Sequence, residues 1–266
     1  MKIFIIDKKI SLGVFFLIFI FFILFFIFYH PITFATTLDS NCIIDEHTRE
    51  IFSNLTKSNE KIAYLTFDDG PTTKATSKIL DILKEEDVKA TFFVVGKHVK
   101  EYPELVKREY EEGHYIANHG YSHNNKKLYQ NTESFINEVK NTDIEIGKAI
   151  GIPNYCSHVF RFPNGYMSSN YKYQKKQSAK ALQEMDYIYV DWNCLNKDSE
   201  KKISNTKLLN NLKKTSKNKG TLVILMHDTN DVNDTTAILK DSIDYLRSQN
   251  YEFKNFYELL QNNSLN

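Results

Sequence analysis

Short runs of apolar residues alternate with longer charged segments over most of this chain. β-Branched and aromatic side chains dominate the runs at residues 62–67, 90–95, 115–118, 159–161, 187–192, 221–226 and 251–253. Apolar side chains recur at helical spacing at residues 78–86, 102–112, 132–150, 178–185, 206–216 and 236–248, with a further short helix near residues 44–55. This alternation predicts a parallel sheet covered by helices, either a barrel or a doubly wound sheet.

The N-terminal segment has a different pattern. Residues 10–29 carry no charge and follow a lysine-containing start. Twenty helical residues span about 30 Å, the hydrocarbon thickness of a bilayer. The run is longer than the ~7–15 apolar residues of a signal peptide, and no clean small-x-small site follows it. We therefore expect a transmembrane signal-anchor; the alternative is a signal peptide cleaved near residues 34–35, which would release a secreted protein.

The charges on either side of this segment predict its orientation. Lysines precede it and acidic residues follow it, which places the N-terminus in the cytoplasm. We expect a cytoplasmic N-terminus at residues 1–9, the anchor at 10–29, an extracytoplasmic stalk at 30–60 and a domain at 61–263. Roughly 200 residues suit one domain with a sizeable core. The predicted location is the cell membrane, with a single span and the domain outside.

Composition excludes one class of partner and leaves the thiols open. A formal net charge of +1 at pH 7 gives no case for nucleic-acid binding. Three cysteines, Cys42, Cys156 and Cys194, are an odd number and too few for a disulfide scaffold. A bridge between Cys156 and Cys194 is one alternative outside the cell, and unpaired thiols are the favoured interpretation.

Two adjacent carboxylates end the first predicted strand of the domain. Asp68 and Asp69 are followed at once by Gly70 and Pro71, which force a turn. Two crowded carboxylates repel each other and are costly to leave unpaired unless a cation is present. The dipeptide alone would fit an acidic surface turn, because a short motif match is only a hypothesis.

Paired histidines strengthen the interpretation of these carboxylates as a metal site. His119 and His123 follow the predicted strand at residues 115–118, and histidines four apart share one face if the backbone turns helically. Two imidazole nitrogens and one carboxylate make three protein ligands, which leave an open position as in a catalytic site. A divalent ion there would acidify a water and polarise a carbonyl, and the other aspartate could accept the proton.

Further polar residues stand at the ends of other predicted strands. Arg161 ends the run at residues 159–161, Asp191 and Trp192 end the run at 187–192, and His227 follows the run at 221–226. Each has a structural explanation when taken alone. Parallel-sheet folds build their sites at the carboxyl ends of strands, so five such motifs in one domain favour a functional site.

Taken in order, these motifs resemble the NodB-homology polysaccharide deacetylases, carbohydrate esterase family 4 (CE4). Residues 66–70 match the first motif of that family, and the histidines at 119 and 123 match the second. Residues 161–165, 191–192 and 225–227 resemble the third, fourth and fifth. The resemblance implies a distorted (β/α) barrel and the metal-dependent removal of acetyl groups from N-acetylated sugars.

The resemblance also implies a role for each catalytic residue. Asp68 would be the general base, with Arg161 orienting it, and His227 would be the general acid that protonates the leaving amine. Asp191 would keep His227 charged, although Asp198 competes for that position. The metal ligands would be Asp69, His119 and His123. Zinc is the first choice of ion, with cobalt, nickel and manganese as alternatives.

The same resemblance implies residues that contact the substrate. They would form the acetyl pocket and the walls of the groove: Pro163, Asn164, Gly165, Tyr166, Trp192 and Leu225. The backbone N–H near Asn164 or Gly165 would be an oxyanion donor beside the metal. This chain departs from the family pattern in two places. Gly120 stands where a serine or threonine is usual, and Asn164 replaces a frequent aromatic residue.

The expected activity is deacetylation of N-acetylglucosamine in peptidoglycan, because a tethered enzyme reaches the wall around its own cell. Alternatives within enzymes are a deacetylase of chitin oligosaccharides or of an exported polysaccharide, and a xylan O-acetyl esterase. A catalytically silent sugar-binding protein on the same fold is a third reading. We expect an acetylated cell-wall glycan as partner, the membrane through one N-terminal helix, and a monomer.

Overall fold

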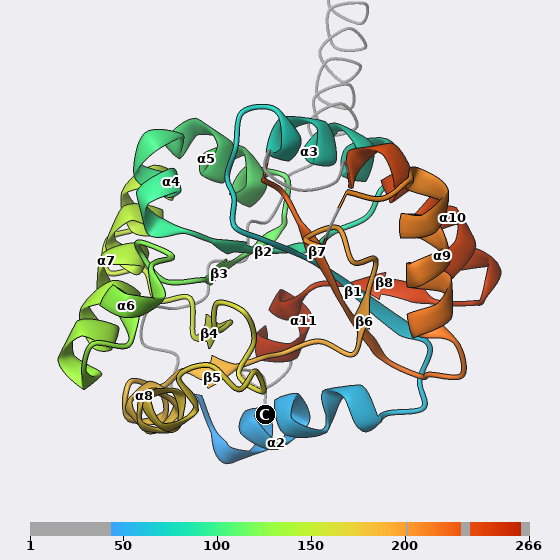
Figure 1. The fold of residues 1–266 in the computed structure, drawn as a ribbon. Helices are drawn as coiled ribbons and strands as arrows, with labels where there is room; N and C mark the ends of the chain where they lie inside the picture. The colour runs from blue at the N-terminus through green and yellow to red at the C-terminus, as the bar shows by residue number, and fades with distance from the viewer. Residues whose placement is uncertain (1–43, 201, 230–234, 262–266) are drawn as a thin grey trace, which may run out of the picture. The chain divides into compact units, whose positions relative to one another are not determined.

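The structure is a computed structural model that describes residues 44–200, 202–229 and 235–261 (Figure 1). The predicted anchor at residues 10–29, residues 30–43 of the predicted stalk and Cys42 lie outside the described residues. Within the described ranges, no helix is long and apolar enough to cross a membrane. Cys156 and Cys194 are both free thiols, which confirms the favoured interpretation for these two.

A sheet of eight parallel strands forms the centre of the described part of the chain. The strands are β1 (Ile62–Asp68), β2 (Thr91–Val94), β3 (Tyr115–Asn118), β4 (Val159–Phe160), β5 (Ile188–Tyr189), β6 (Cys194–Leu195), β7 (Leu222–His227) and β8 (Glu252–Lys254). Their order is β5-β4-β3-β2-β1-β7-β6, and β8 pairs with the first half of β1. The first strand of the domain therefore lies in the interior of the sheet, between β2 and β7.

The two edge strands of this sheet are consecutive in the chain. β5 ends at Tyr189 and β6 begins at Cys194, so the intervening residues can span at most about 17 Å. The sheet must therefore curl until its edges nearly meet. We call residues 190–193 the bridging segment, because they cross the gap that strand pairing does not close. This arrangement fits the distorted barrel that the resemblance implied.

Helices cover the outside of the curled sheet (Figure 1). The longer ones are α3 (Ala75–Glu85), α5 (Pro103–Glu111), α7 (Thr132–Ile150), α8 (Lys172–Glu184), α9 (Asn205–Ser216) and α10 (Thr236–Ser248). The shorter ones are α2 (Glu46–Asn54), the 3₁₀ turn η1 (Leu55–Lys57), α4 (Gly96–Glu101), α6 (Asn125–Leu128) and α11 (Phe256–Gln261). Connections between parallel strands need such crossovers.

The strands are buried on both faces, as in parallel sheets generally. On β1, Leu65 and Phe67 pack in one core cluster with residues of the covering helices α3, α5 and α10, whereas Tyr64 packs in a second cluster inside the barrel. Phe52 of α2 and Leu55 belong to this inner cluster. The short helix that the sequence placed in the stalk therefore packs into the core of the domain.

Most of the longer elements occur where the sequence pattern predicts them, whereas most of the short elements were not predicted. Patterns at residues 62–67, 90–95, 115–118, 221–226 and 251–253 correspond to β1, β2, β3, β7 and β8. The apolar run at 187–192 contains only a two-residue strand, β5, because the chain leaves the sheet to form the bridging segment. No sequence pattern predicted α4, α6, α11 or β6. Each has six residues or fewer, which is too short to show a period.

Candidate active site

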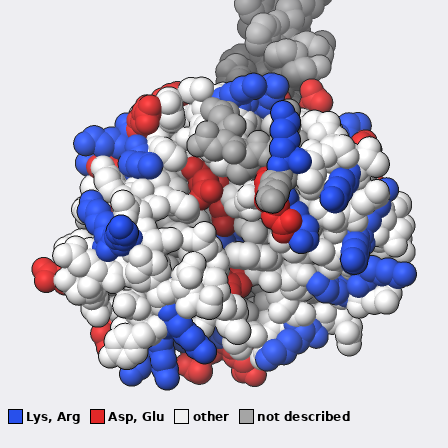
Figure 2. All heavy atoms as spheres, in the orientation of Figure 1, with Lys and Arg blue, Asp and Glu red and all other residues white. Residues whose placement is uncertain are grey.

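The ends of adjacent parallel strands bring the predicted site residues together. In the register of β1 and β7, Asp68 lies opposite His227. His119 directly follows β3, and Arg161 directly follows β4. The space-filling view shows acidic side chains near the hollowed middle of one face, with lysines and arginines mostly around its rim (Figure 2).

Asp68 is held by a buried arginine. Nη1 of Arg161 lies 2.8 Å from Oδ1 of Asp68 and 2.6 Å from Oγ1 of Thr66. The arginine side chain has no exposed surface, and its guanidinium stacks 4.0 Å from the centroid of the Phe93 ring. A buried ion pair needs such additional partners to offset desolvation. The result is a carboxylate with one oxygen fixed and the other, Oδ2, 3.9 Å from Nε2 of His119.

The three predicted metal ligands form a cluster. Oδ1 of Asp69 lies 3.4 Å from Nε2 of His119 and 3.1 Å from Nε2 of His123. One ligand atom from each residue lies within 4.8 Å of the others. Burial would raise the pKa of Asp69, but the two imidazoles beside it, when protonated, hold that pKa well below its usual value.

The hydrogen bonds around this cluster fit a bound cation. Nδ1 of His119 lies 2.8 Å from the backbone oxygen of Arg161. Because a carbonyl oxygen only accepts, Nδ1 carries the proton, and Nε2 of the neutral ring presents a lone pair to Asp69. Oδ1 of Asp69 is buried and has no hydrogen-bond partner among the described residues. Lone pairs that face each other in a buried site are costly, and a divalent cation between them would remove that cost.

A buried glutamate on α7 holds the loop that carries the histidines. Oε2 of Glu138 accepts hydrogen bonds from the backbone N–H of Tyr121 at 3.0 Å and of Ser122 at 2.6 Å, and from the Ser122 hydroxyl at 2.9 Å. Oδ1 of Asn118 accepts from the N–H of Gly120 at 2.9 Å. Gly120 has a φ of 82°, which glycine adopts without strain. The carboxylate of Glu138 and the amide of Asn118 thus hold the histidine loop in place, although Gly120 offers no hydroxyl to do so.

The carboxylate that pairs with His227 is Asp198, and the expected pairing with Asp191 is not found. Oδ1 of Asp198 lies 2.7 Å from Nδ1 of His227, and its Oδ2 accepts from the His227 backbone N–H at 2.8 Å. Burial would lower the pKa of His227, but the hydrogen bond and charge of Asp198, with smaller contributions from Asp68 and Asp69, raise it to about 9. The ring is therefore charged at neutral pH and can donate a proton.

Asp191 has a different structural position from the one expected. Its Oδ1 accepts from the backbone N–H of Tyr166 at 2.9 Å, and its Oδ2 accepts from that of Met167 at 3.2 Å. The bridging segment lies outside the sheet, so its carboxylate reaches the loop after β4 instead of the histidine at the end of β7. Asp191 orients the loop in which the substrate-contacting residues were predicted.

A buried lysine supports the same loop from α8. Nζ of Lys175 donates to the backbone oxygen of Gly165 and to the Ser168 hydroxyl, and the residue is 1% exposed. A Cβ on Gly165 would lie 2.8 Å from the Trp192 ring, and the φ of Gly165 is 78°. Glycine is therefore required where the loop meets the tryptophan.

The other predicted substrate contacts lie on or beside this loop, with differing exposure. Pro163 is buried and Asn164 is exposed, and the Tyr166 ring packs at a tilt against the Tyr189 ring, with 4.5 Å between the ring centroids. Leu225 on β7 is 5% exposed. The N–H of Gly165 already donates to the backbone oxygen of Phe162 at 2.7 Å. Of the two predicted oxyanion donors, the N–H of Asn164 is therefore the one that this hydrogen bond does not occupy.

Sequence reasoning missed three supporting residues. It also placed a fourth, Asp198, behind Asp191 as the partner of His227. Glu138 was detectable, because it falls at helical spacing with the apolar residues of α7 on the buried face. Lys175 lies before the segment predicted as helix, and Asn118 was read only as a strand residue. Asp198 was considered, but it follows no predicted strand, and only its place after β6 brings it to His227.

The geometry defines a class of protein. A curled parallel sheet carries a cluster of one aspartate and two histidines, a fixed carboxylate and a charged histidine at its strand ends, a set of groups that is typical of a hydrolase. The polysaccharide deacetylase family model matches residues 56–183. Together with the relatives described next, this match shows that the chain belongs to the polysaccharide deacetylase family, CE4.

Similar proteins include proteins named as a deacetylase and an esterase, and one named as a pseudoenzyme. A peptidoglycan-N-acetylglucosamine deacetylase of Bacillus cereus is 38% identical over 213 residues, which cover 77% of this chain and 73% of that protein. A CE4 esterase structure from Streptococcus mutans superposes with a TM-score of 0.70 at 30% identity, covering 77% of this chain and 89% of that one. A CE4 pseudoenzyme from Bacillus anthracis superposes with a TM-score of 0.62 at 27% identity, covering 76% and 66%.

Proposed function

We propose that this protein hydrolyses the acetamide of N-acetylglucosamine residues in peptidoglycan, and that it needs a divalent metal ion to do so. The observation that carries the proposal is the placement of Asp68 and His227 at neighbouring strand ends, with the cluster of Asp69, His119 and His123 beside them. The peptidoglycan-N-acetylglucosamine deacetylase from Bacillus cereus supports the choice of substrate.

The residues divide the reaction between them. A divalent cation held by Asp69, His119 and His123 would supply polarisation of the acetyl carbonyl and a water of lowered pKa. Asp68 accepts a proton as the oxygen of water forms its bond to the carbonyl carbon, and Arg161 keeps the carboxylate aligned for this transfer. As the carbon–nitrogen bond breaks, His227 gives its proton to the amine. The products are acetate and a free amino sugar.

We propose zinc as the native ion, with cobalt, nickel and manganese as the alternatives. Two imidazole nitrogens and one carboxylate suit zinc in a site with an open position. The affinity of most nitrogen and oxygen sites rises from manganese towards nickel and copper, so metal content and activity must be measured separately for each ion.

The test is mass analysis of wall fragments after treatment with the full-length protein in detergent. We expect loss of one acetyl group per modified sugar, and no loss with the Asp68→Asn variant. Acetate release from acetylated xylan but not from wall fragments would instead identify an O-acetyl esterase. Activity restricted to chitin oligosaccharides or to another N-acetylated polysaccharide would reassign the substrate within the same chemistry.

A catalytically silent protein is the alternative from another class, since a pseudoenzyme shares this fold. A silent member should lack a part of the site. This chain retains the aspartate pair and both histidines, arranged within reach of one ion, and we therefore favour the enzyme. Absence of acetate release from every substrate in metal-loaded protein would support the silent alternative.

We also propose the extracytoplasmic placement that the N-terminal sequence predicts. It rests on the uncharged run at residues 10–29 and the lysines before it. Sequencing the N-terminus of the protein isolated from cells separates an anchor, which keeps these residues, from a cleaved signal peptide, which leaves a start near residue 36.

A further inference from the structure

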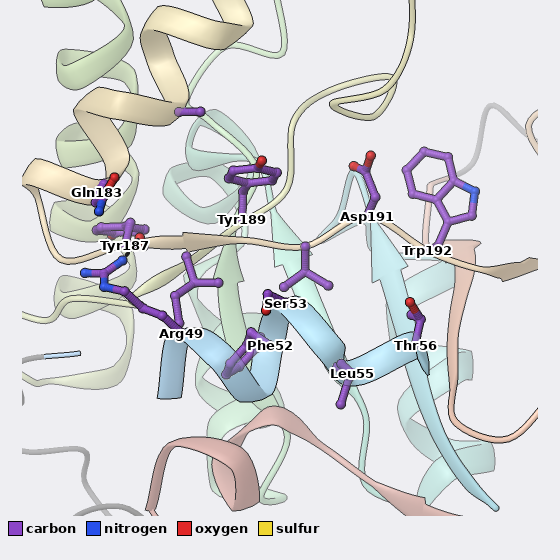
Figure 3. Close-up of a pocket in the computed structure, with 13 residues that line it drawn as sticks. Arg49, Phe52, Ser53, Leu55, Thr56, Gln183, Tyr187, Tyr189, Asp191 and Trp192 are labelled. Carbon is purple, nitrogen blue, oxygen red and sulfur yellow. Dashed lines mark hydrogen bonds between the residues drawn. The ribbon is translucent and has the colours of Figure 1, made fainter. Parts of the chain in front are cut away.

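A groove lies between α2 and α8, along the chain segment at residues 187–192 (Figure 3). Its volume is about 430 Å³. Ser53 and Thr56 line it from the α2 side and Gln183 lines it from α8, while Arg49 and Trp192 lie at its two ends. We call this the α2 groove.

The charged groups of the α2 groove already have partners. Nη1 of Arg49 donates to the backbone oxygen of Tyr187 at 3.0 Å, and its Nη2 lies 3.3 Å from Oδ1 of Asp186. Both oxygens of Asp191 accept backbone N–H groups. What the lining offers a ligand is hydroxyl and amide groups above an apolar base that includes Phe52. Such a lining fits a neutral molecule rich in hydroxyl groups.

The edge strand adds backbone groups to this lining. The N–H groups of Ile188 and Val190 donate to the backbone oxygens of His158 and Phe160, so alternation along the strand turns the N–H and C=O of Tyr189 away from β4. The carbonyl of Tyr187 points the same way and accepts from Arg49, which shows that this side faces the groove. A donor and an acceptor are thereby available at the exposed edge of the sheet.

Trp192 lies between the α2 groove and the candidate active site, because it lines the groove and also lies beside Arg161. The guanidinium of Arg161 lies 5.8 Å from the centroid of the Trp192 ring, and its Nη1 lies 2.8 Å from Asp68. The bridging segment therefore separates the proposed base from the groove by the width of two side chains. A polymer that places one sugar at Asp68 must continue over neighbouring surface.

The family resemblance does not assign this groove. The family model begins at residue 56, whereas α2 covers Glu46–Asn54. One wall of the groove is thus built by residues that precede the matched region and that pack on the barrel through Phe52.

We infer that the α2 groove binds the glycan chain of the substrate beyond the sugar that is deacetylated. The inference rests on the proposed function, because it names where the same polymer continues. Hydroxyl and acetamide groups of the sugars would bond with Ser53, Thr56, Gln183 and the Tyr189 backbone. The groove would therefore strengthen the binding of long glycan substrates and have no effect on the binding of short ones.

The test fills the groove and compares long with short substrates. Ser53→Trp introduces a large side chain on the groove side of α2, and Gln183→Trp does so from α8. Glu50→Trp is the matched control, because Glu50 is exposed on the same helix and does not line the groove. The ratio of kcat/KM for peptide-free wall glycan strands to that for an N-acetylglucosamine disaccharide is measured for each variant.

We expect both groove variants to lower this ratio about tenfold, the loss of one favourable subsite, while Glu50→Trp keeps the parent ratio. An unchanged ratio in both groove variants that remain active on the disaccharide would overturn the groove inference alone. A reduced ratio seen only with peptide-bearing strands would assign the groove to the peptide and also overturn it. A parent protein inactive on both substrates would overturn the proposed function.

Discussion

Two adjacent aspartates acquire different surroundings because the backbone turns between them. Asp68 is the last residue of β1 and pairs with Arg161, which directly follows β4. Asp69 has a φ of 78°, an uncommon conformation for a residue with a side chain, and this turns its carboxylate toward His119 and His123. The same residue type therefore meets a guanidinium in one case and two imidazoles in the other.

Amide variants of these aspartates should fail in different ways. Asp69→Asn replaces a charged donor by a neutral one and should weaken metal binding, so excess metal should restore part of its activity. Asp68→Asn keeps all three ligands but loses the proton acceptor, a contribution of about 10²–10⁴ in rate that metal cannot restore. Metal content and rate are measured side by side. If Asp68→Asn purifies without metal and recovers on its addition, the two roles are reversed.

The pairing of His227 with Asp198 predicts a pH effect. The pKa of His227 is raised to about 9 by this carboxylate, so the general acid is protonated below that pH, and activity should fall as pH rises through it. Asp198→Asn removes the negative charge, lowers the pKa of His227 and should move the alkaline limb of kcat/KM to lower pH by about one unit or more. The comparison variant is Asp191→Asn.

Asp191→Asn should leave the alkaline limb in place, because Asp191 bonds to backbone N–H groups of the loop after β4. Its effect should be a rise in KM through a less ordered loop. A shift of the alkaline limb in Asp191→Asn, with none in Asp198→Asn, would restore the pairing that the family resemblance first implied.

At the scale of elements, long periodic segments were predictable and short ones depended on tertiary context. The apolar runs of β1 and β7 are continuous because both faces of a central parallel strand are buried, and this pattern is visible in the sequence. β6 has two residues and is a strand only because it pairs with β7. Its position brings Asp198 to His227, which explains why the partner of that histidine could not be ranked from sequence.

The supporting role of α7 gives a prediction at this scale. Glu138→Gln keeps the size of the side chain but replaces an acceptor of three hydrogen bonds by a group that is a weaker acceptor. The histidine loop should loosen, and metal affinity should fall about 10–100-fold, as for other residues that orient ligands. Titration of the apoprotein with zinc measures the change.

The matched control is Glu145→Gln on the same helix, where the half-buried Glu145 pairs with the exposed Lys148 and, within the described residues, forms no hydrogen bond with the histidine loop. It should bind zinc as the parent does. Equal affinities for the parent and Glu138→Gln would show that the loop keeps its conformation without this carboxylate.

At the scale of the whole molecule, the candidate site sits on a scaffold that does not depend on it. The positions of the main strands in the sequence and the motifs at their ends were predictable, because a parallel sheet gathers its carboxyl ends at one rim. The curl of the sheet and the packing of α2 against it through Phe52 were not, because both depend on tertiary contacts that local sequence patterns do not encode. Two core clusters, one under the helices and one inside the barrel, stabilise this frame.

Metal removal should therefore abolish activity and leave the fold intact. The histidine loop is bonded to Glu138 and Asn118, so its backbone keeps its partners in the apoprotein. Binding at 100 times Kd stabilises a protein by about 2.7 kcal/mol, and chelation should thus lower Tm by roughly 5–10 °C for a domain of this size. Far-ultraviolet circular dichroism below the transition should be unchanged, and addition of zinc should restore both Tm and activity. Full activity in protein shown to be free of metal would overturn the assignment of Asp69, His119 and His123 as ligands of a catalytic ion.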